Sequence, residues 1–308
     1  MTEPSLEELT SAQIRKQLAG KGLSLRLGAF VFSLRSSVRE LDESLRQQYA
    51  RHRVASSDSF IDFSVRVRQS PGPRRLLKPQ AIFEVEGQRP FHPMARSQAF
   101  ALFEWGLNWC IYSHCHHLLI FHGAVLAQGE HAILLPAPSG SGKSTLCAAL
   151  MLRGWRLLSD ELILLDPADG TLTPVCRPVG LKNESIDVIR NFSPNAVLSN
   201  PVHDTSKGTV AHLAPTAGSV AQANTSAQPR WLVFPRFLAN SELQVAPIKK
   251  TSAFIRLMRN AFNYSALGLT GFNALSNLID QVDAYQITFG DLNSAVHWCD
   301  QLVKGNDK

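Results

Sequence analysis

Alternating apolar and polar positions predict strands in the first third of the chain. Residues 23–34 and 60–68 alternate with the period of half-buried strands. Residues 98–114 differ, because their apolar positions recur at helical spacing, which predicts a buried helix. We therefore expect a strand-rich N-terminal region at 1–95 and a second domain at 96–308.

The second domain is predicted to mix helices and strands, which makes the chain an α/β protein with a mixed sheet. Short apolar runs predict strands at 132–135, 155–159, 231–237 and 285–288, and helical periodicity predicts helices at 144–153, 252–264, 271–282 and 291–302. Residues 199–230 are rich in Ser, Thr, Ala, Pro and Asn. We expect a long loop there, in the manner of a mobile lid over an active site.

A glycine-rich stretch lies between a predicted strand and a predicted helix. Its sequence, Ala137-Pro-Ser-Gly-Ser-Gly-Lys-Ser-Thr145, matches the phosphate-binding P-loop pattern G-x-x-x-x-G-K-[ST], with alanine at the first position. Strand, loop and helix in this order are the context that the motif requires. The candidate nucleotide-binding residues are Ser139, Gly140, Ser141, Gly142, Lys143, Ser144 and Thr145.

The chemistry of a P-loop assigns these residues distinct tasks. Gly140 and Gly142 let backbone N–H groups turn inward around phosphate oxygens, and the helix that follows adds its positive end. Lys143 is expected to reach the outer phosphates, and the Ser144 hydroxyl to hold Mg²⁺. The cofactors predicted from this stretch are therefore ATP and Mg²⁺.

The lengths of the next two elements return two acidic residues to the loop. A ten-residue helix travels roughly 15 Å, and the five-residue strand after it returns roughly 16 Å. Asp160 and Glu161 should therefore lie level with the P-loop, where a carboxylate can bind Mg²⁺ or accept a proton from an attacking hydroxyl. Because adjacent strand residues point to opposite faces, the pattern favours only one of the pair meeting the phosphates.

His122 is placed by a predicted hairpin that leads into the loop. Apolar residues flank the turn Gln128-Gly-Glu130, and antiparallel pairing about this turn sets His122 opposite residues 135–137. We therefore expect His122 at the mouth of the P-loop. Ordinary doubly wound P-loop proteins approach the loop from a parallel strand, so the hairpin indicates a different P-loop family.

Together these residues resemble the HPr kinase/phosphorylase family. In that family a His-Gly pair lies 21 residues before the P-loop lysine, as His122 lies before Lys143. The loop S-G-x-G-K-S, the helix end R-G-x-R-L at 153–157 and two following acids also match. The resemblance covers about 115–190, and RPVGLKNESID, KGTVAHL and FPRF further on look like the branch called HPr kinase-related kinase A.

The resemblance implies the fold shared with phosphoenolpyruvate carboxykinase, and phosphorylation of a serine on a small protein or peptide. It implies that Lys143 and Ser144 hold phosphate and metal, that the acidic pair supplies the base and metal contacts, and that His122 assists. The sequence has Glu161 where the family usually has Asp. It lacks the E-[IV]-R-G-x-G stretch, for which Arg177, Lys182, Asn183 and Glu184 are loose substitutes, with Glu184 as a further candidate metal ligand.

Other candidates and functions remain open. Lys207, His212 and Arg236 are candidates for contacting phosphate or substrate, whereas His114-Cys-His-His117 lacks the spacing of a zinc site. A kinase of small molecules or sugars would use the same site as a protein kinase. A nucleotide-sensing module without catalysis is a third interpretation.

Composition adds limits on partners and compartment. Residues 1–96 hold 16 Lys/Arg against 10 Asp/Glu, which accounts for the formal net charge of +6, but they lack the interleaved aromatic residues of a nucleic-acid platform. Five cysteines without tight spacing suggest free thiols. No apolar run is long enough to span a bilayer, and the polar, acidic start is unlike a signal peptide. We expect a cytoplasmic protein, with a homo-oligomer left open.

Overall fold

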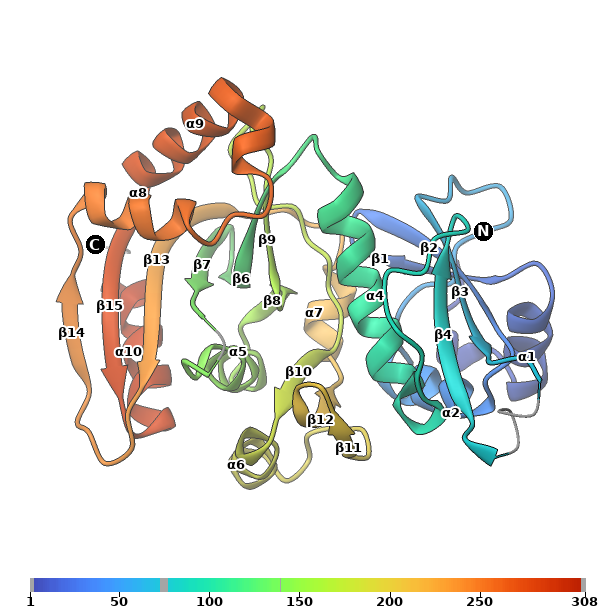
Figure 1. The fold of residues 1–308 in the computed structure, drawn as a ribbon. Coiled ribbons are helices and arrows are strands. Elements are labelled where there is room, and N and C mark those ends of the chain that lie inside the picture. Colours follow the sequence, from blue (N-terminus) through green and yellow to red (C-terminus); the bar gives the residue numbers. More distant parts are fainter. Residues whose placement is uncertain (1–2, 73–76, 139, 306–308) are drawn as a thin grey trace.

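The computed structural model describes residues 3–72, 77–138 and 140–305, which form three sheets flanked by helices (Figure 1). The predicted class, α/β with a mixed sheet, is confirmed. Two of the sheets combine parallel and antiparallel pairs.

The first sheet lies in the N-terminal region and has the order β1-β2-β3-β4-β5. Its strands are β1 (Leu23–Leu27), β2 (Phe30–Ser36), β3 (Phe63–Gln69), β4 (Gln80–Val85) and β5 (Met94–Ala95). Where its residues are described with an element of their own, this region has the helices η1 (Leu6–Glu8), α1 (Ser11–Ala19), α2 (Arg39–Gln48) and η2 (Arg96–Gln98). Alternation in β1 and β3 buries every second residue, as the sequence predicts.

The second sheet has seven strands and contains the hairpin that leads into the glycine-rich loop. Its order is β14-β15-β13-β7-β6-β8, with β9 also paired to β6. The strands are β6 (Leu119–Gln128), β7 (His131–Pro136), β8 (Arg156–Ser159), β9 (Leu162–Leu165), β13 (Gln228–Phe237), β14 (Gln244–Pro247) and β15 (Asp283–Phe289). β13 runs parallel to β7, whereas β6 runs antiparallel to β7, β8 and β9.

Helices cover both faces of this second sheet (Figure 1). On one face, α5 (Lys143–Leu152) and α10 (Leu292–Gly305) bury alternate residues of β6 and β7. On the other face, α8 (Lys250–Met258) and α9 (Tyr264–Gln281) bury the residues between them. Because both faces are covered, the central strands are apolar throughout instead of alternating.

The segment predicted as a long loop, 199–230, instead contributes to a third, small sheet. β10 (Val179–Lys182), β12 (Gly208–Leu213) and β11 (Val202–Thr205) form it in that order, all antiparallel. The short helix α7 (Ala217–Ala221) follows, and α6 (Glu184–Phe192) lies between β10 and β11 along the chain. The loop prediction fails because the outer strand β11 is largely exposed and so carries few large apolar residues.

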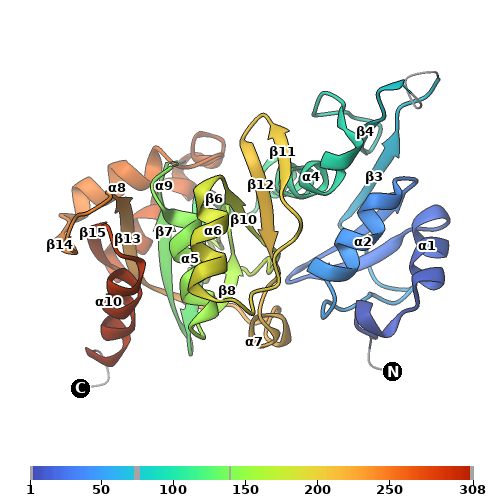
Figure 2. The ribbon, with the colours of Figure 1, turned by 90° about the horizontal axis from the view of Figure 1, so that it is seen from below.

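Helix α4 (Ala99–His114) stands between the two larger sheets (Figures 1 and 2). The division predicted at residue 95/96 places it with the second domain, and that division stays a prediction. The helix packs against the first sheet, because most of its buried residues belong to the same core as β1 to β4. Gly106 allows this approach, since a Cβ atom there would lie 2.1 Å from the Phe83 ring.

Buried polar contacts join α4 and the N-terminal region to the rest of the chain. Arg177, just before β10, forms an ion pair with Glu104 of α4 at 3.0 Å, and both side chains are about 95% buried. The Tyr49 hydroxyl donates to the same Glu104 carboxylate, and Arg177 also donates to Asn108. Since a charge left unpaired at this depth would be costly, these contacts fix the position of α4.

The cysteines and the basic residues have the environments described below. All five cysteines are free and buried. On β3, Arg68 pairs with Glu84 at 2.9 Å, which offsets part of the positive charge of residues 1–96; Arg74 and Arg75, two further basic residues of that region, lie outside the described residues. Among the helices of the described ranges, none is both long and apolar enough to cross a bilayer.

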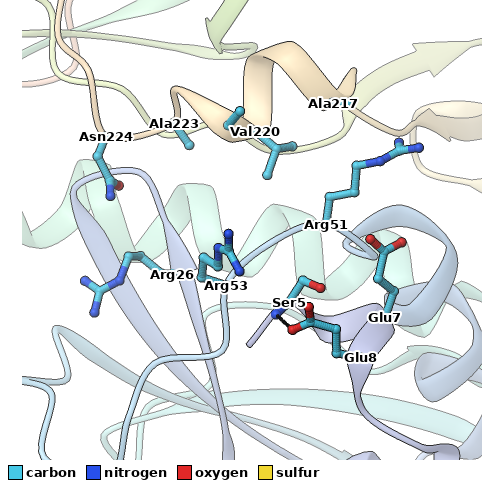
Figure 3. Close-up of a pocket in the computed structure, with 11 residues that line it drawn as sticks. Ser5, Glu7, Glu8, Arg26, Arg51, Arg53, Ala217, Val220, Ala223 and Asn224 are labelled. Atoms are coloured by element: carbon cyan, nitrogen blue, oxygen red, sulfur yellow. Dashed lines mark hydrogen bonds between the residues drawn. The ribbon is translucent and has the colours of Figure 1, made fainter. Parts of the chain in front are cut away.

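A cavity of about 450 Å³ lies where α7 faces the N-terminal region (Figure 3). Its lining mixes charges: Arg26, Arg51 and Arg53 lie with Glu7 and Glu8 below Val220 of α7. Arg26 is already bound to Glu3, and Arg53 donates to the Glu3 carbonyl at 2.9 Å. Two of the three arginines therefore already have partners within the N-terminal region, and the cavity lies between this region and α7.

Two fully buried histidines predict loss of stability in acid. Burial lowers the pKa of His52 to about 4 and that of His212 to about 3, so both stay neutral in the fold while the unfolded chain takes up protons below about pH 6.5. Each should therefore remove about 1.4 kcal/mol of unfolding free energy per pH unit as the pH falls from 6.5 toward its folded pKa. Urea denaturation at pH 7, 6 and 5 measures this slope.

The matched variant is His52→Gln, which keeps a donor for the Cys176 carbonyl that His52 Nε2 contacts at 2.9 Å. In this variant, the loss of unfolding free energy per pH unit in acid should be smaller by the contribution of one histidine, about 1.4 kcal/mol. Between pH 7.5 and 9 histidine is neutral in both states, so the variant and the parent should show equal slopes there. An unchanged acid slope in the variant would contradict the assignment.

Candidate active site

The glycine-rich loop connects the end of β7 to the first residue of α5. Gly142 caps the helix with a φ of 86°, and Gly140 has a φ of 85°, so both occupy the left-handed region that favours glycine. A Cβ atom on Gly142 would also lie 2.9 Å from Phe237 Cβ. The Ser141 carbonyl accepts a hydrogen bond from the Phe237 N–H at 2.9 Å, which ties the loop to β13.

The N-terminal end of α5 has unpaired donors that suit an anion. The first backbone N–H groups of a helix have no partner within it, and they carry partial positive charge. The Ser141 hydroxyl is buried without a hydrogen-bond partner among the described residues. Lys143 and Ser144 occupy the first turn of the same helix. This arrangement fits a phosphate group; Ser139, another predicted contact, lies outside the described residues.

Asp160 lies next to the N-terminal end of α5. Its Oδ1 atom is 3.4 Å from Lys143 Nζ and accepts a hydrogen bond from Ser144 Oγ, also at 3.4 Å. Its Oδ2 atom accepts from the Gly180 N–H of β10 at 3.2 Å. The side chains of Lys143 and Asp160 are only 5% and 2% exposed. The return predicted from element lengths therefore brings Asp160 to the loop.

Glu161 points to a different partner, as expected for neighbouring residues of opposite orientation. Its Oε2 atom lies 3.5 Å from His122 Nδ1, and its Oε1 atom lies 4.0 Å from Lys182 Nζ. Glu161 has a φ of 78° in the short turn between β8 and β9. A left-handed conformation is unfavourable for a residue with a Cβ atom, so the turn holds Glu161 in place at a conformational cost.

Cations around the acidic pair set the protonation states. Burial opposes ionisation of Glu161, but the ammonium groups of Lys143, Lys182 and Lys207 outweigh it and lower the pKa of Glu161 to about 2. Burial and the nearby Lys143 ammonium lower the pKa of His122, so its ring is neutral near pH 7. For Lys143, Asp160 and Glu161 outweigh burial and raise its pKa. The site therefore contains an ionised Glu161, a charged Lys143 and a neutral His122.

The position of His122 follows from the strand pairing. Gly123 lies opposite Pro136 in the β6–β7 hairpin, so the predicted antiparallel register is confirmed. On the other edge of β6, His122 lies opposite Leu162 of β9, the residue after Glu161. The His122 N–H also donates to the Asn260 carbonyl at 2.8 Å. Both edges of the strand thus hold the imidazole beside Glu161.

The donors present fit one divalent cation shared with a phosphate group. Ser144 Oγ and the Asp160 carboxylate are hard oxygen donors on the same side of Lys143, and Mg²⁺ is typically held by one or two protein oxygens together with substrate phosphates. The described residues contain no cluster of three or more His, Cys, Asp or Glu side chains that could hold a metal alone. Of the other predicted site residues, Glu184, a candidate metal ligand, is exposed at the start of α6. Thr145, a candidate nucleotide contact, lies in the first turn of α5.

Beyond Glu161 lies a second cavity, of about 890 Å³. His122, Glu161 and Phe262 form one part of its lining, and Trp105, Asn108 and Tyr112 of α4 form another. Lys207, at the turn between β11 and β12, completes the lining near Trp105, with its ammonium 4.6 Å from the centre of the indole ring. The predicted candidate Lys207 is therefore on the same side as Glu161.

The sequence pattern does not predict the contribution of α4 to this cavity. Residues 105, 108 and 112 recur at the spacing of one helical face, which is the signal that could have identified them. The signal was hidden because α4 is apolar on nearly all sides: its other face packs against the first sheet. Only the three-dimensional arrangement separates the two faces.

The remaining candidates lie elsewhere. Arg177 is occupied by Glu104, and His212 is fully buried against the Phe100 ring at 5.0 Å. Arg236 is exposed on β13, next to the residue that binds the loop. His114 Nδ1 contacts the Cys110 carbonyl at 3.0 Å, and Cys115 is buried, an arrangement that belongs to the end of α4.

Comparisons with known proteins add little to this geometry. No model of a protein family matches the chain, and no curated protein matches it. Among solved structures, the Hpr(Ser) kinase/phosphatase from Coxiella burnetii is similar over 61% of this chain and 95% of its own, with 13% sequence identity and a TM-score of 0.27. Similarity of this degree leaves the function to be inferred from the site itself.

The buried Lys143–Asp160 pair predicts strong coupling between its two residues. Asp160→Asn leaves an ammonium buried without a counter-charge, and Lys143→Met leaves a buried carboxylate, so each should lower the unfolding free energy by about 3 kcal/mol. The double variant removes both charges and should recover most of that loss. Urea denaturation of the four proteins without nucleotide gives the coupling energy.

The matched control is the exposed pair Lys250–Asp280, with a comparable distance of 3.0 Å and side-chain exposures of 59% and 72%. Lys250→Met and Asp280→Asn should couple by less than about 1 kcal/mol, because solvent screens exposed pairs. Equal coupling at the two sites would show that burial of the Lys143 pair has no energetic consequence.

Proposed function

We propose that the protein is an ATP- and Mg²⁺-dependent phosphotransferase that moves the terminal phosphoryl group to a hydroxyl. The observation that carries this proposal is the meeting of Lys143, Ser144 and Asp160 at the start of α5, with Glu161 and His122 directly beyond. An anion-binding helix end is thereby joined to a carboxylate that faces a cavity.

On the phosphate side, the residues provide positive charge and oxygen ligands. Lys143 would exchange part of its contact with Asp160 for the phosphate oxygens, while Gly140 and Gly142 keep the backbone N–H groups directed inward. Ser144 and Asp160 would hold Mg²⁺, which when bound with ATP neutralises the charge of the transferring group. Preorganised charge of this kind, which stabilises the transition state, is usually the largest contribution to the rate enhancement of phosphoryl transfer.

On the acceptor side, Glu161 is the proposed base. Its carboxylate is ionised at neutral pH, because its pKa lies near 2, and it faces the cavity instead of the loop. It would orient an acceptor hydroxyl and take its proton as the phosphoryl group is transferred. The neutral His122 ring lines the same cavity, with its Nδ1 atom 3.5 Å from Glu161 Oε2.

The acceptor class proposed from the motif resemblance is a serine of a small protein or peptide. A kinase of small molecules is the second candidate, which is favoured by the volume of about 890 Å³ beside Glu161, since ligand pockets of this size enclose small molecules. A nucleotide-sensing module is a third, but the charged residues needed for transfer are all present.

The proposal predicts different results for the two carboxylates. Glu161→Gln should lower phosphoryl transfer by about 10²-fold or more, while nucleotide affinity stays within about threefold, because the side chain acts on the acceptor. Asp160→Asn should lower both, and Lys143→Ala should abolish transfer. The measurement is transfer of labelled γ-phosphate from ATP with Mg²⁺ into a lysate of the source cell, with nucleotide binding followed separately.

Asp169→Asn is the matched control, because it removes an exposed carboxylate from the turn after β9. It should transfer phosphate as the parent does. Label incorporation that survives in Lys143→Ala would refute the assignment of the site. Tight nucleotide binding with no labelled product in any fraction of the lysate would instead favour the nucleotide-sensing module.

A further inference from the structure

The cavity beyond Glu161 is built mostly by parts of the chain outside the glycine-rich loop. Helix α4 supplies Trp105, Asn108 and Tyr112, and the segment before it supplies Phe91 and Met94. The cavity meets the acidic pair at Glu161, the carboxylate that faces away from Lys143. A molecule in this space would therefore approach the phosphate site from the acceptor side.

Two aromatic rings of the lining stack against each other, and one of them lies beside His122. The Tyr112 and Phe262 rings stack with centroids 4.9 Å apart and an angle of 9° between their planes. Phe262 is also edge-on to His122, with centroids 6.3 Å apart, so the stacked pair continues directly from the imidazole. Phe262 is nevertheless 46% exposed, which leaves aromatic surface available to a ligand.

The charges of the lining argue against a strongly anionic acceptor. Besides two histidines and Tyr112, the ionisable residues of the lining are Glu161, Asp204 and Lys207. Lys207 lies over the Trp105 ring, and burial lowers its pKa. The lining itself therefore carries two carboxylates against one ammonium, and the further positive charge near Glu161 comes from Lys143 and Lys182, which lie outside the lining; the cavity walls thus offer no cluster of cations to a phosphate-bearing acceptor.

We propose that this cavity binds the acceptor, and that the acceptor is an alcohol with an aromatic or bulky apolar group close to its hydroxyl. The apolar group would lie against Tyr112 and Phe262, and the hydroxyl would point to Glu161. The inference rests on the proposed function and specifies its substrate. The same chemistry could come from a small alcohol or from a serine flanked by aromatic residues in an exposed peptide segment.

The transfer step balances with these residues. The acceptor oxygen forms a bond to the γ-phosphorus, and the bond from that phosphorus to the bridging oxygen of ATP breaks. The electron pair of the broken bond leaves on ADP, and the hydroxyl proton passes to the Glu161 carboxylate. The products are a phosphate monoester and ADP, so no further reactant is needed.

Four probes test the acceptor class with labelled γ-phosphate and the full-length chain. They are the peptides Ac-Phe-Ser-Phe-amide and Ac-Gly-Ser-Gly-amide, and the alcohols 2-phenylethanol and ethanol. We expect the aromatic member of at least one pair to be phosphorylated at least tenfold faster than its partner. The faster aromatic probe then shows whether a peptide or a small molecule is the better source.

Phe262→Ala is the decisive variant, because this exposed side chain can be truncated without opening the core. It should raise KM for the aromatic probe about tenfold and leave KM for ATP unchanged. Phe272→Ala is the matched control: its ring is 48% exposed on α9 and lies outside the cavity lining. The control should match the parent in both constants.

Equal rates for aromatic and plain probes, or equal effects of the two phenylalanine variants, would overturn the proposal. Failure of all four probes in a protein that does label a lysate component would also overturn it, while leaving the proposed kinase function intact. Failure of the kinase function itself would appear differently, as absence of any Lys143-dependent label in the lysate.

Discussion

Strand β6 is hydrogen-bonded along both edges, to β7 on one side and to β8 and β9 on the other, and this pairing determines the geometry of the site. The β7 register fixes where the glycine-rich loop begins. The β8 and β9 registers fix the turn that carries Asp160 and Glu161. His122 lies on β6 itself, so one strand relates all three parts of the site. A slip of one residue would exchange the faces of every side chain involved.

The turn between β8 and β9 separates two carboxylates that are neighbours in the chain. Asp160 is held by Lys143, Ser144 and the Gly180 N–H, all on the side of α5. Glu161, with its left-handed backbone, faces His122 and the cavity. Adjacent acids in one solvent-exposed environment would have similar properties. Here different partners hold one acid beside α5 and the other beside the cavity, which supports the proposed division of roles.

Local patterns were sufficient to predict the glycine-rich loop, the return of Asp160 and the hairpin that holds His122, because each depends on consecutive elements of known length. Other parts could not be predicted in this way. Helix α2 was missed because Leu41 and Leu45 are its only buried large apolar residues, and β11 was taken for a loop because it is an exposed edge. The cavity is not predicted either, since segments from residue 90 to residue 262 form it, and no local pattern records how they meet.

The ion pair between Arg177 and Glu104 has a consequence for attempts to divide the chain. Arg177 belongs to the segment after β9, whereas Glu104 belongs to α4, which shares its core with the first sheet. A fragment that begins after α4 would contain the whole glycine-rich loop but would carry a guanidinium with no carboxylate to receive it. The half of the chain that contains the glycine-rich loop therefore depends on α4 for the partner of Arg177. Since α4 precedes this half in the sequence, the ribosome makes that partner first.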